Sequence, residues 1–162
     1  MQTAYFAGGC FWCVEAVFQR IDGVLEVTSG YCNGTSINPT YQEICTGTTG
    51  HAEVVKIAFD ETLVSFNELL AVFFATHDAT TLNQQGNDKG TQYRSAVFYI
   101  DANQQLQVES FIKTLNGVVT EVSKLDTFYP AEDYHQNYYN NHSNQPYCQA
   151  LIAPKLAKYF NE

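Results

Sequence analysis

The feature that most restricts the fold of this chain is an alternation between two hydrophobic patterns along its 162 residues. Short segments with the pattern of a β-strand alternate with longer segments whose apolar residues recur about every three to four positions, as in an amphipathic helix. Residues 3–9 and 51–60 show the strand pattern, whereas 10–21 and 65–78 show the helix pattern. This alternation predicts an α+β fold in which helices pack on a mixed sheet as an α/β two-layer sandwich.

Turn-forming and helix-capping residues set the limits of the other expected elements. Ser65 is expected to cap the helix that follows it, and Gly23 is expected to end the helix at 10–21. The polar segments 35–50 and 79–92 are expected to be long loops, which in a compact domain are usually functional. The remaining strands are expected at 23–34, 93–101 and 117–126, and the remaining helices at 102–116, 131–142 and 149–161.

Hydrophobic residues make up 45% of the chain, which contains no internal repeat, low-complexity tract or linker. These properties predict a single domain spanning residues 1–162. The formal net charge of −9 argues against binding to nucleic acid or to an anionic membrane surface, because both need a basic face. No apolar run reaches the roughly 20 residues of a transmembrane helix. The N-terminal residues lack the basic start and apolar stretch of a signal peptide, so we expect a cytoplasmic protein.

The segment GGCFWC at residues 8–13 places two cysteines at the start of the first expected helix. Cys10 falls where the strand ends and the helix begins, and the unpaired N–H groups of a helix N-terminus stabilise a thiolate. This position is expected to lower the pKa of Cys10, and it suits a nucleophile. Cys13 lies one helical turn further on, a spacing that brings the Cα atoms close enough for a disulfide with Cys10.

The spacing of the cysteines leaves several interpretations open. The chain has five cysteines, an odd number that is unusual for a secreted disulfide scaffold, and a close pair in a reducing compartment is more often catalytic or metal-binding. A zinc clip would need a second ligand pair, whereas Cys32 and Cys45 are far apart in the sequence and His51 stands alone. Cys10 and Cys13 could also be core thiols, and Cys32 and Cys45 are expected to be structural.

Aromatic and polar residues elsewhere could meet the cysteine pair. Phe11 and Trp12 either anchor the helix or line an apolar pocket that holds a methyl or thioether group. Glu53 stands at the start of a strand after a glycine turn, where it is either solvated or functional. The residues of the segments GNDKGTQYRS and FYPAEDYHQNYY are either functional or structural, for example as a loop-stabilising ion pair or a partly buried histidine. Their candidates are Asp88, Tyr93, Arg94 and His135.

Five ordered segments closely resemble the peptide methionine sulfoxide reductases of the A type, from the first strand to about residue 155. The segments are GGCFWCVEAVFQRIDGV, SGYCNG, NPTYQEICTGTTGHAEVVKIAFD, LNQQGNDKGTQYRSAVFY and FYPAEDYHQNYY. The resemblance implies an α/β sandwich related to the ferredoxin-like fold. It also implies reduction of the S epimer of methionine sulfoxide, free or in proteins, to methionine. The implied protein repairs oxidative damage as a monomer, with thioredoxin as reductant and without a metal or organic cofactor.

The resemblance also implies roles for individual residues. Cys10 would attack the sulfoxide sulfur, and Phe11 and Trp12 would enclose the methyl group of the substrate. Glu53 would protonate the sulfoxide oxygen, which is a poor leaving group unless it is protonated. Burial would raise the pKa of Glu53 in the direction that keeps the carboxyl protonated. The remaining implied residues are Tyr41 and Tyr93, which would assist through hydrogen bonds, and Asp88, which would hold the substrate backbone or order the pocket.

A second cysteine would then condense with the sulfenic acid formed on Cys10. Members of the resembled family differ here, since some use a cysteine at the position of Cys13 and others a cysteine in a flexible tail, near Cys148. The sequence after Cys148 has a helical pattern and is not Gly-rich, so we favour Cys13 as the resolving residue and Cys148 as a second relay. Two alternative functions are a thiol–disulfide oxidoreductase that uses Cys10–Cys13 and a non-catalytic binding module for oxidised methionine.

Overall fold

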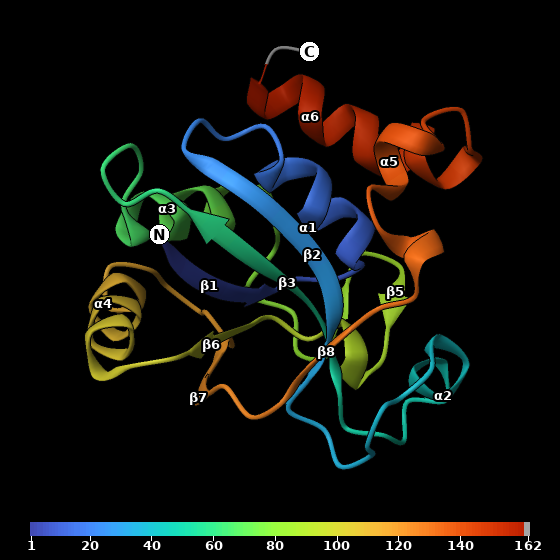
Figure 1. Ribbon diagram of the computed structural model, residues 1–162, viewed down its shortest axis with the longest axis horizontal. Coiled ribbons are helices and arrows are strands. Elements are labelled where there is room, and N and C mark those ends of the chain that lie inside the picture. Colours follow the sequence, from blue (N-terminus) through green and yellow to red (C-terminus); the bar gives the residue numbers. More distant parts are fainter. Residues whose placement is uncertain (161–162) are drawn as a thin grey trace.

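The computed structural model describes residues 1–160, and its centre is a twisted six-stranded sheet (Figure 1). The strands lie in the order β7-β6-β1-β3-β2-β8, and β6 and β7 run parallel while the other neighbours are antiparallel. The bounds are β1 Gln2–Ala7, β2 Val24–Cys32, β3 Ala52–Phe59, β6 Ala96–Tyr99, β7 Glu121–Lys124 and β8 Phe128–Pro130. A separate hairpin consists of β4 (Gln84–Gln85) and β5 (Asp88–Lys89).

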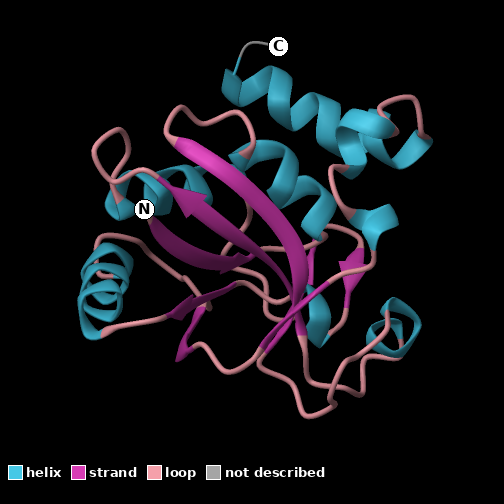
Figure 2. Ribbon diagram, viewed as in Figure 1, coloured by secondary structure: helices cyan, strands magenta, loops and turns pink. Residues whose placement is uncertain are grey.

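The main hydrophobic core lies where α1 and α3 pack against the sheet, and it extends through η3 to Leu156 of α6. Phe6 of β1 packs against Phe18 of α1 and stacks on Phe73 of α3, with ring centroids 4.9 Å apart in the stack. Figure 2 shows α4 beside the β6–β7 edge of the sheet, away from α5 and α6. The helices are α1 Phe11–Phe18, α2 Tyr41–Cys45, α3 Phe66–Thr76, α4 Ala102–Ile112, α5 Tyr138–Asn141 and α6 Ala153–Phe160. Three further helical turns are η1 Thr91–Tyr93, η2 Asp133–His135 and the π-helical η3 Cys148–Ile152.

The central part of the fold is a strand–helix–strand–strand–helix–strand unit made of β1, α1, β2, β3, α3 and β6. Its four strands are neighbours in the order β6-β1-β3-β2 and are antiparallel, which is the ferredoxin-like arrangement. Strands β7 and β8 extend the unit at its two edges, and the parallel β7 makes the sheet mixed. The predicted α+β two-layer fold with a mixed sheet is therefore confirmed. The strand expected at 117–126 is the shorter β7.

Local sequence signals predict the first half of the chain well. The hydroxyl of Ser65 accepts the N–H of Glu68, and the carboxylate of Glu68 accepts the N–H of Ser65 in return, so the expected cap of α3 is present. The expected strand at 51–60 is β3. Helix α1 ends at Phe18, earlier than expected, and the chain turns toward β2 through Gly23, whose φ of +95° favours glycine.

Two segments that were expected to be loops contain regular structure. Within 35–50, α2 is capped by Thr40, whose hydroxyl accepts the N–H of Glu43. His51 is buried beside this segment and binds its backbone through both ring nitrogens. Segment 79–92 contains β4, β5 and the start of η1. These polar elements are two to five residues long and are too short to show a hydrophobic period.

The C-terminal part of the chain departs most from the expectation. The helix expected at 131–142 is divided into η2 and α5 by Asn137, whose φ of 54° is left-handed and interrupts a right-handed helix. Strand β8 ends at Pro130 and pairs with β2 at the sheet edge, where a missing N–H is tolerated. The helix expected at 149–161 begins earlier, with η3, and its expected last residue, Asn161, lies outside the described residues.

Several strand ends meet at one edge of the sheet. Ala7 at the end of β1 is paired with Ala96 at the start of β6, and Tyr31 near the end of β2 is paired with Glu53 near the start of β3. Segments that are far apart in the sequence, including the turn after β1, therefore reach the same place. Through residue 160, the chain has no helix with the length and apolarity that a membrane crossing requires.

Candidate active site

Cys10 occupies the turn between β1 and α1. The chain leaves β1 through Gly8 and Gly9, and Gly9 has a φ of +92°, which glycine adopts without strain. A Cβ atom at Gly9 would lie 2.7 Å from the side chain of Gln85. Cys10 is the N-cap of α1, and its carbonyl accepts the N–H of Cys13 at 3.1 Å. The thiol is therefore held at the start of a helix, where the sequence placed it.

Glu53 carries a carboxyl group that is buried beside this turn, with an exposed fraction of 1%. Its Oε1 accepts the N–H of Phe11 at 3.1 Å, whereas its Oε2 is buried and has no hydrogen-bond partner within the described chain. Burial raises the pKa of Glu53 to about 8, although the N–H of Phe11 acts in the opposite direction. Glu53 is therefore mostly protonated at neutral pH, and Oε2 is the oxygen from which a proton can be donated.

The thiols of Cys10 and Cys13 differ in acidity. Burial raises the pKa of Cys10 well above its usual value, and the hydrogen bond with Cys13 and the charge of Glu53 act in the same direction. The pKa of Cys13 is lowered, chiefly by the hydrogen bond with Cys10 and also by the positive charge of Lys155. The expectation that the helix N-terminus lowers the pKa of Cys10 is therefore wrong for the site without substrate. Removing this sulfur from water disfavours the thiolate more than the first helical turn favours it.

Trp12 is held by three aromatic neighbours. Its Nε1–H donates to Nδ1 of His135 at 3.0 Å, and burial lowers the pKa of His135, which keeps the ring neutral and Nδ1 free to accept. The indole stacks on Tyr138 with ring centroids 3.8 Å apart, and the ring of Tyr147 meets it edge-on at 5.8 Å. Phe11 is buried and contacts the ring of His135 at 5.2 Å. These contacts fix both aromatic residues that follow Cys10.

Tyr41 and Tyr93 approach Glu53 from α2 and η1. Burial raises the pKa of both phenols, and the negative charge of Glu53 raises it further, so both stay protonated. Glu132 holds Tyr41 in place, since its Oε2 accepts the backbone N–H of Tyr41 at 3.0 Å. The other oxygen of Glu132 accepts the hydroxyl of Tyr31 at 2.9 Å.

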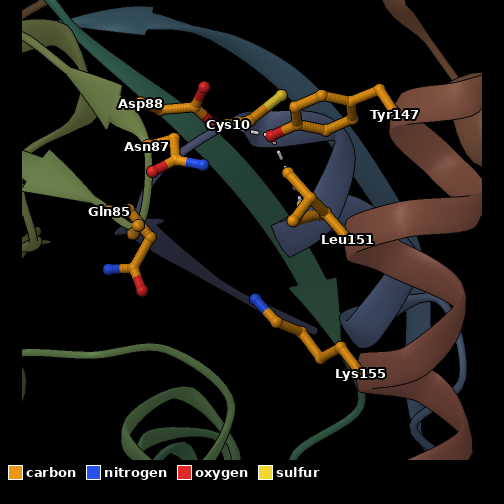
Figure 3. Close-up of a pocket in the computed structure, with 10 residues that line it drawn as sticks. Cys10, Gln85, Asn87, Asp88, Tyr147, Leu151 and Lys155 are labelled. Carbon is orange, nitrogen blue, oxygen red and sulfur yellow. Dashed lines mark hydrogen bonds between the residues drawn. The ribbon is translucent and has the colours of Figure 1, made fainter.

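Asp88 lines a cavity of 190 Å³ beside Cys10 and Cys13 (Figure 3). Tyr147 closes one side of this cavity, because its hydroxyl donates to Oδ2 of Asp88 at 2.7 Å and lies 3.9 Å from Sγ of Cys13. Leu151 and Lys155 line the same wall. The predicted site residues that do not line the cavity are Phe11, Trp12, Tyr41, Glu53, Tyr93 and Cys148.

The other cysteines lie in different surroundings. Cys148 is fully buried in η3, which packs against α1, and its pKa is raised by burial and by the charge of Cys13. Cys32 is buried, as expected for a structural thiol, whereas Cys45 is exposed at the end of α2. Among residues 1–160, no three or more histidine, cysteine or acidic side chains are grouped as a metal site would require.

Sequence patterns did not reveal the residues that support Trp12 and Phe11. Glu15 of α1 is buried, and its carboxylate accepts the backbone N–H groups of Asn137 at 2.9 Å and of Tyr138 at 3.1 Å. The aromatic segment after residue 128 was the available signal for these contacts, but nothing in it indicated their partners. Among residues 1–160, Asp88 and Arg94 do not form the loop-stabilising ion pair that their segment allowed, since Arg94 pairs with Glu121 at 3.0 Å and Asp88 accepts the hydroxyl of Tyr147.

Comparison with known proteins identifies the family of this chain. The family model described as "Peptide methionine sulfoxide reductase" matches residues 2–162. The chain belongs to the peptide methionine sulfoxide reductase family. A peptide methionine sulfoxide reductase MsrA of Vesicomyosocius okutanii is 67% identical to this reductase, and the match covers 100% of each chain.

Solved structures agree with this assignment. Mxr1 from Saccharomyces cerevisiae in its reduced form superposes on the reductase with a TM-score of 0.82 and 31% identity, covering 91% of this chain and 88% of Mxr1. Mxr1 in complex with Trx2 gives a TM-score of 0.58 at 21% identity, with 83% of each chain covered, and this match shows the fold alone. The family, the oxidoreductase class and the fold that the sequence predicted are confirmed.

Proposed function

We propose that this reductase converts the S epimer of methionine sulfoxide, free or in proteins, to methionine through attack by Cys10. The buried Glu53 is the observation that carries this proposal. Its carboxyl is bonded to the N–H of Phe11, directly after the nucleophile, and its pKa of about 8 keeps a proton available at neutral pH. A buried, protonated acid next to a thiol suits a reaction in which oxygen must leave sulfur.

In the first step, the sulfur of Cys10 attacks the sulfoxide sulfur while Oε2 of Glu53 protonates the oxygen. The Cys13 sulfur, which accepts the hydrogen bond of Cys10, takes the thiol proton as the attack begins. The S–O bond and the newly formed S–S bond then break as the protonated oxygen passes to the Cys10 sulfur, which becomes a sulfenic acid, and methionine is released with its sulfur reduced by two electrons. Tyr41 and Tyr93 are protonated donors for the same oxygen, because the pKa of both phenols is raised.

The substrate is held by aromatic and acidic groups around this sulfur. Phe11 and Trp12 enclose the methyl group, and the contacts of Trp12 with His135 and Tyr138 keep its indole in one orientation. Asp88 either orders the cavity, through its hydrogen bond with Tyr147, or binds the substrate backbone after that bond opens.

In the second step, the sulfur of Cys13 attacks the sulfur of the Cys10 sulfenic acid, and the hydroxyl leaves with a proton as water. Cys13 is favoured because it lies in the first turn after Cys10. Cys148 is fully buried near Cys13 and serves as a second relay. Thioredoxin then reduces the disulfide, and the structure of Mxr1 in complex with Trx2 supports a reductant of this type.

The wider setting of the reaction is part of the same proposal. Residues 1–162 form one catalytic domain that works as a monomer and uses no metal or organic cofactor. We place it in the cytoplasm, where a reducing environment keeps its five cysteines available as thiols. Sedimentation of the reduced protein and fractionation of cells test these two points.

A single-turnover reaction tests the chemistry. Reduced protein is mixed with L-methionine-S-sulfoxide, after which methionine and free thiols are counted and the disulfide is mapped. One methionine formed for two thiols lost, with a Cys10–Cys13 bond, is the expected result. Methionine formation without thiol loss would contradict the disulfide step, and a Cys10–Cys148 bond would make Cys148 the resolving residue.

A thiol–disulfide oxidoreductase is the alternative that the Cys10–Cys13 pair suggests. Such an enzyme needs neither a protonated Glu53 nor an enclosed Trp12, both of which are present here. Reduction of insulin disulfides, compared with reduction of free methionine sulfoxide under the same reductant, separates the two activities. A non-catalytic binding module would bind the sulfoxide and form no methionine.

A further inference from the structure

The cavity beside Cys10 adjoins a wider groove between the end of α3 and α6. The groove has a volume of 540 Å³, and both it and the cavity are lined by Gln85 and Lys155. Its residues on α6 include Lys158. Reduction of a free methionine sulfoxide needs contact only with the groups around Cys10. The groove therefore offers space for a longer substrate.

The groove concentrates positive charge on an otherwise acidic protein. The chain has 8 lysines and arginines against 17 acidic residues, yet Lys155 and Lys158 lie about one turn apart along this groove. Neither ammonium group forms an ion pair within residues 1–160. Figure 3 shows Lys155 on the side of the cavity away from Asp88. Asp78 also lines the groove, but its carboxylate is held by the N–H of Thr80 at 2.9 Å and by the Thr80 hydroxyl.

Two other polar side chains of the groove, His77 and Gln85, are already hydrogen-bonded within the protein. His77 is neutral, because burial lowers its pKa to about 4, and its ring nitrogens bond the carbonyl of Phe73 and the hydroxyl of Ser95. The amide of Gln85 accepts the N–H of Asp78 at 2.8 Å and donates to the carbonyl of the same residue at 2.9 Å. An anion that enters the groove would therefore find its positively charged partners in the two lysines, which outnumber the single negative charge of Asp78.

We propose that this groove binds the polypeptide that carries the methionine sulfoxide, and that Lys155 and Lys158 favour substrates with an acidic side chain near the sulfoxide. The proposal rests on the function given above. Cys10 and Lys155 line the same cavity, and Lys155 also lines the groove, so a peptide whose sulfoxide reaches Cys10 and whose chain follows the cavity into the groove passes the lysines directly. Ion pairs at such partly exposed sites change affinity only a few-fold each, so the effect is one of preference among oxidised proteins.

Two matched peptides test this preference. Both are blocked pentapeptides with a central methionine-S-sulfoxide, which is flanked by glutamates in one and by glutamines in the other, and dithiothreitol is the reductant. We expect kcat/KM to be about three- to ten-fold higher for the glutamate peptide than for the glutamine peptide. The difference should lie in KM, and the two kcat/KM values should become nearly equal at high salt. Free L-methionine-S-sulfoxide is measured in parallel as a test of the basic reaction.

Charge reversal at Lys158 locates the effect. Lys158→Glu is expected to abolish or invert the ratio between the two peptides. Lys113→Glu is the matched control, because Lys113 is an exposed lysine at the C-terminal end of α4, outside the groove, and it is expected to keep the wild-type ratio. If Lys158→Glu fails to fold, Lys158→Gln is used and is expected to reduce the ratio part of the way.

Three outcomes would overturn the proposal. Equal kcat/KM for the two peptides in the wild-type protein is the first, and an equal loss of preference in Lys113→Glu is the second. The third is an unchanged peptide ratio in Lys158→Glu together with a higher KM for thioredoxin, which would assign the groove to the reductant. A wild-type protein that does not reduce free methionine-S-sulfoxide would instead refute the function itself, so the two failures are distinguishable.

Discussion

Replacement of Glu53 by glutamine tests the proposed acid catalyst with little change in shape. The glutamine carbonyl can still accept the N–H of Phe11, as Oε1 does at 3.1 Å in the wild-type protein. What the variant loses is the proton on Oε2, which lies buried and without a partner within residues 1–160. A positioned general acid contributes about 10²- to 10⁴-fold in rate, so we expect a loss of methionine formation within that range.

The raised pKa of Glu53 also sets the pH dependence. With a pKa of about 8, the carboxyl is protonated in most molecules at pH 7 and in few at pH 9. The wild-type single-turnover rate is therefore expected to fall as the pH rises through 8, by roughly tenfold per unit above it. Since glutamine does not titrate, the corresponding fall should be absent in Glu53→Gln.

The same shift predicts that the variant is more stable than the wild type. The folded protein keeps the Glu53 proton up to a pH of about 8, whereas the unfolded chain releases it near the ordinary value of 4.5. Between these values the folded state binds more protons than the unfolded state, so stability falls as the pH rises. For the wild type at pH 7, the loss in free energy of unfolding is about 3 kcal/mol. Glu53→Gln does not have this loss, because glutamine does not titrate.

Rapid-quench measurement of methionine between pH 6 and 9, with urea unfolding of the same samples, tests both effects. Glu26→Gln is the control, because Glu26 is an exposed carboxylate on β2 and the change should alter neither quantity. A Glu53→Gln variant with the full wild-type rate would refute the acid role. If the two proteins have the same free energy of unfolding as each other at pH 5 and again at pH 8, the raised pKa of Glu53 is refuted.

Three further changes give distinct results. Cys13→Ser should still form one methionine for each protein but leave a sulfenic acid on Cys10, which dimedone detects. Turnover with thioredoxin should fall by about 100-fold. Rapid formation of a Cys10–Cys148 disulfide would contradict this expectation. Glu15→Gln weakens the acceptor for Asn137 and Tyr138 and should lower the free energy of unfolding in urea by about 1–3 kcal/mol. It should also change the fluorescence of Trp12, the only tryptophan, because Tyr138 stacks on it, and an unchanged spectrum would argue against this support. Tyr147→Phe removes a hydroxyl that helps to lower the pKa of Cys13, so the pH midpoint of Cys13 alkylation should rise; an unchanged midpoint would show that the contact is too weak to matter.

Much of the fold could be predicted because its central elements have clear local patterns. The apolar spacing of β3 and α3 and the cap at Ser65 depend on neighbouring residues, and all three were expected where they occur. The broken segment around Asn137 could not be predicted in this way. Its left-handed conformation is supported by the carboxylate of Glu15, which lies 122 residues away in the sequence.

The candidate site also has some features that the sequence predicts and others that depend on the tertiary structure. Cys10 could be placed at a helix N-terminus from the sequence, but its pKa could not, because that depends on burial and on Cys13 and Glu53 around it. The hydrogen bond from Phe11 to Glu53 spans 42 residues, and the one from Tyr147 to Asp88 spans 59.

The sequence by itself determined the order of the central strands and helices and the family, and it supplied the candidate residues for the chemistry, because these depend on local pattern and residue type. Only the tertiary structure decided which side chains are buried together; burial keeps the proton on Glu53 and Cys10, and the hydrogen bond with Cys10 gives Cys13 its lowered pKa. The cost of removing a charge from water depends on every neighbour in space, and those neighbours come from all parts of the chain.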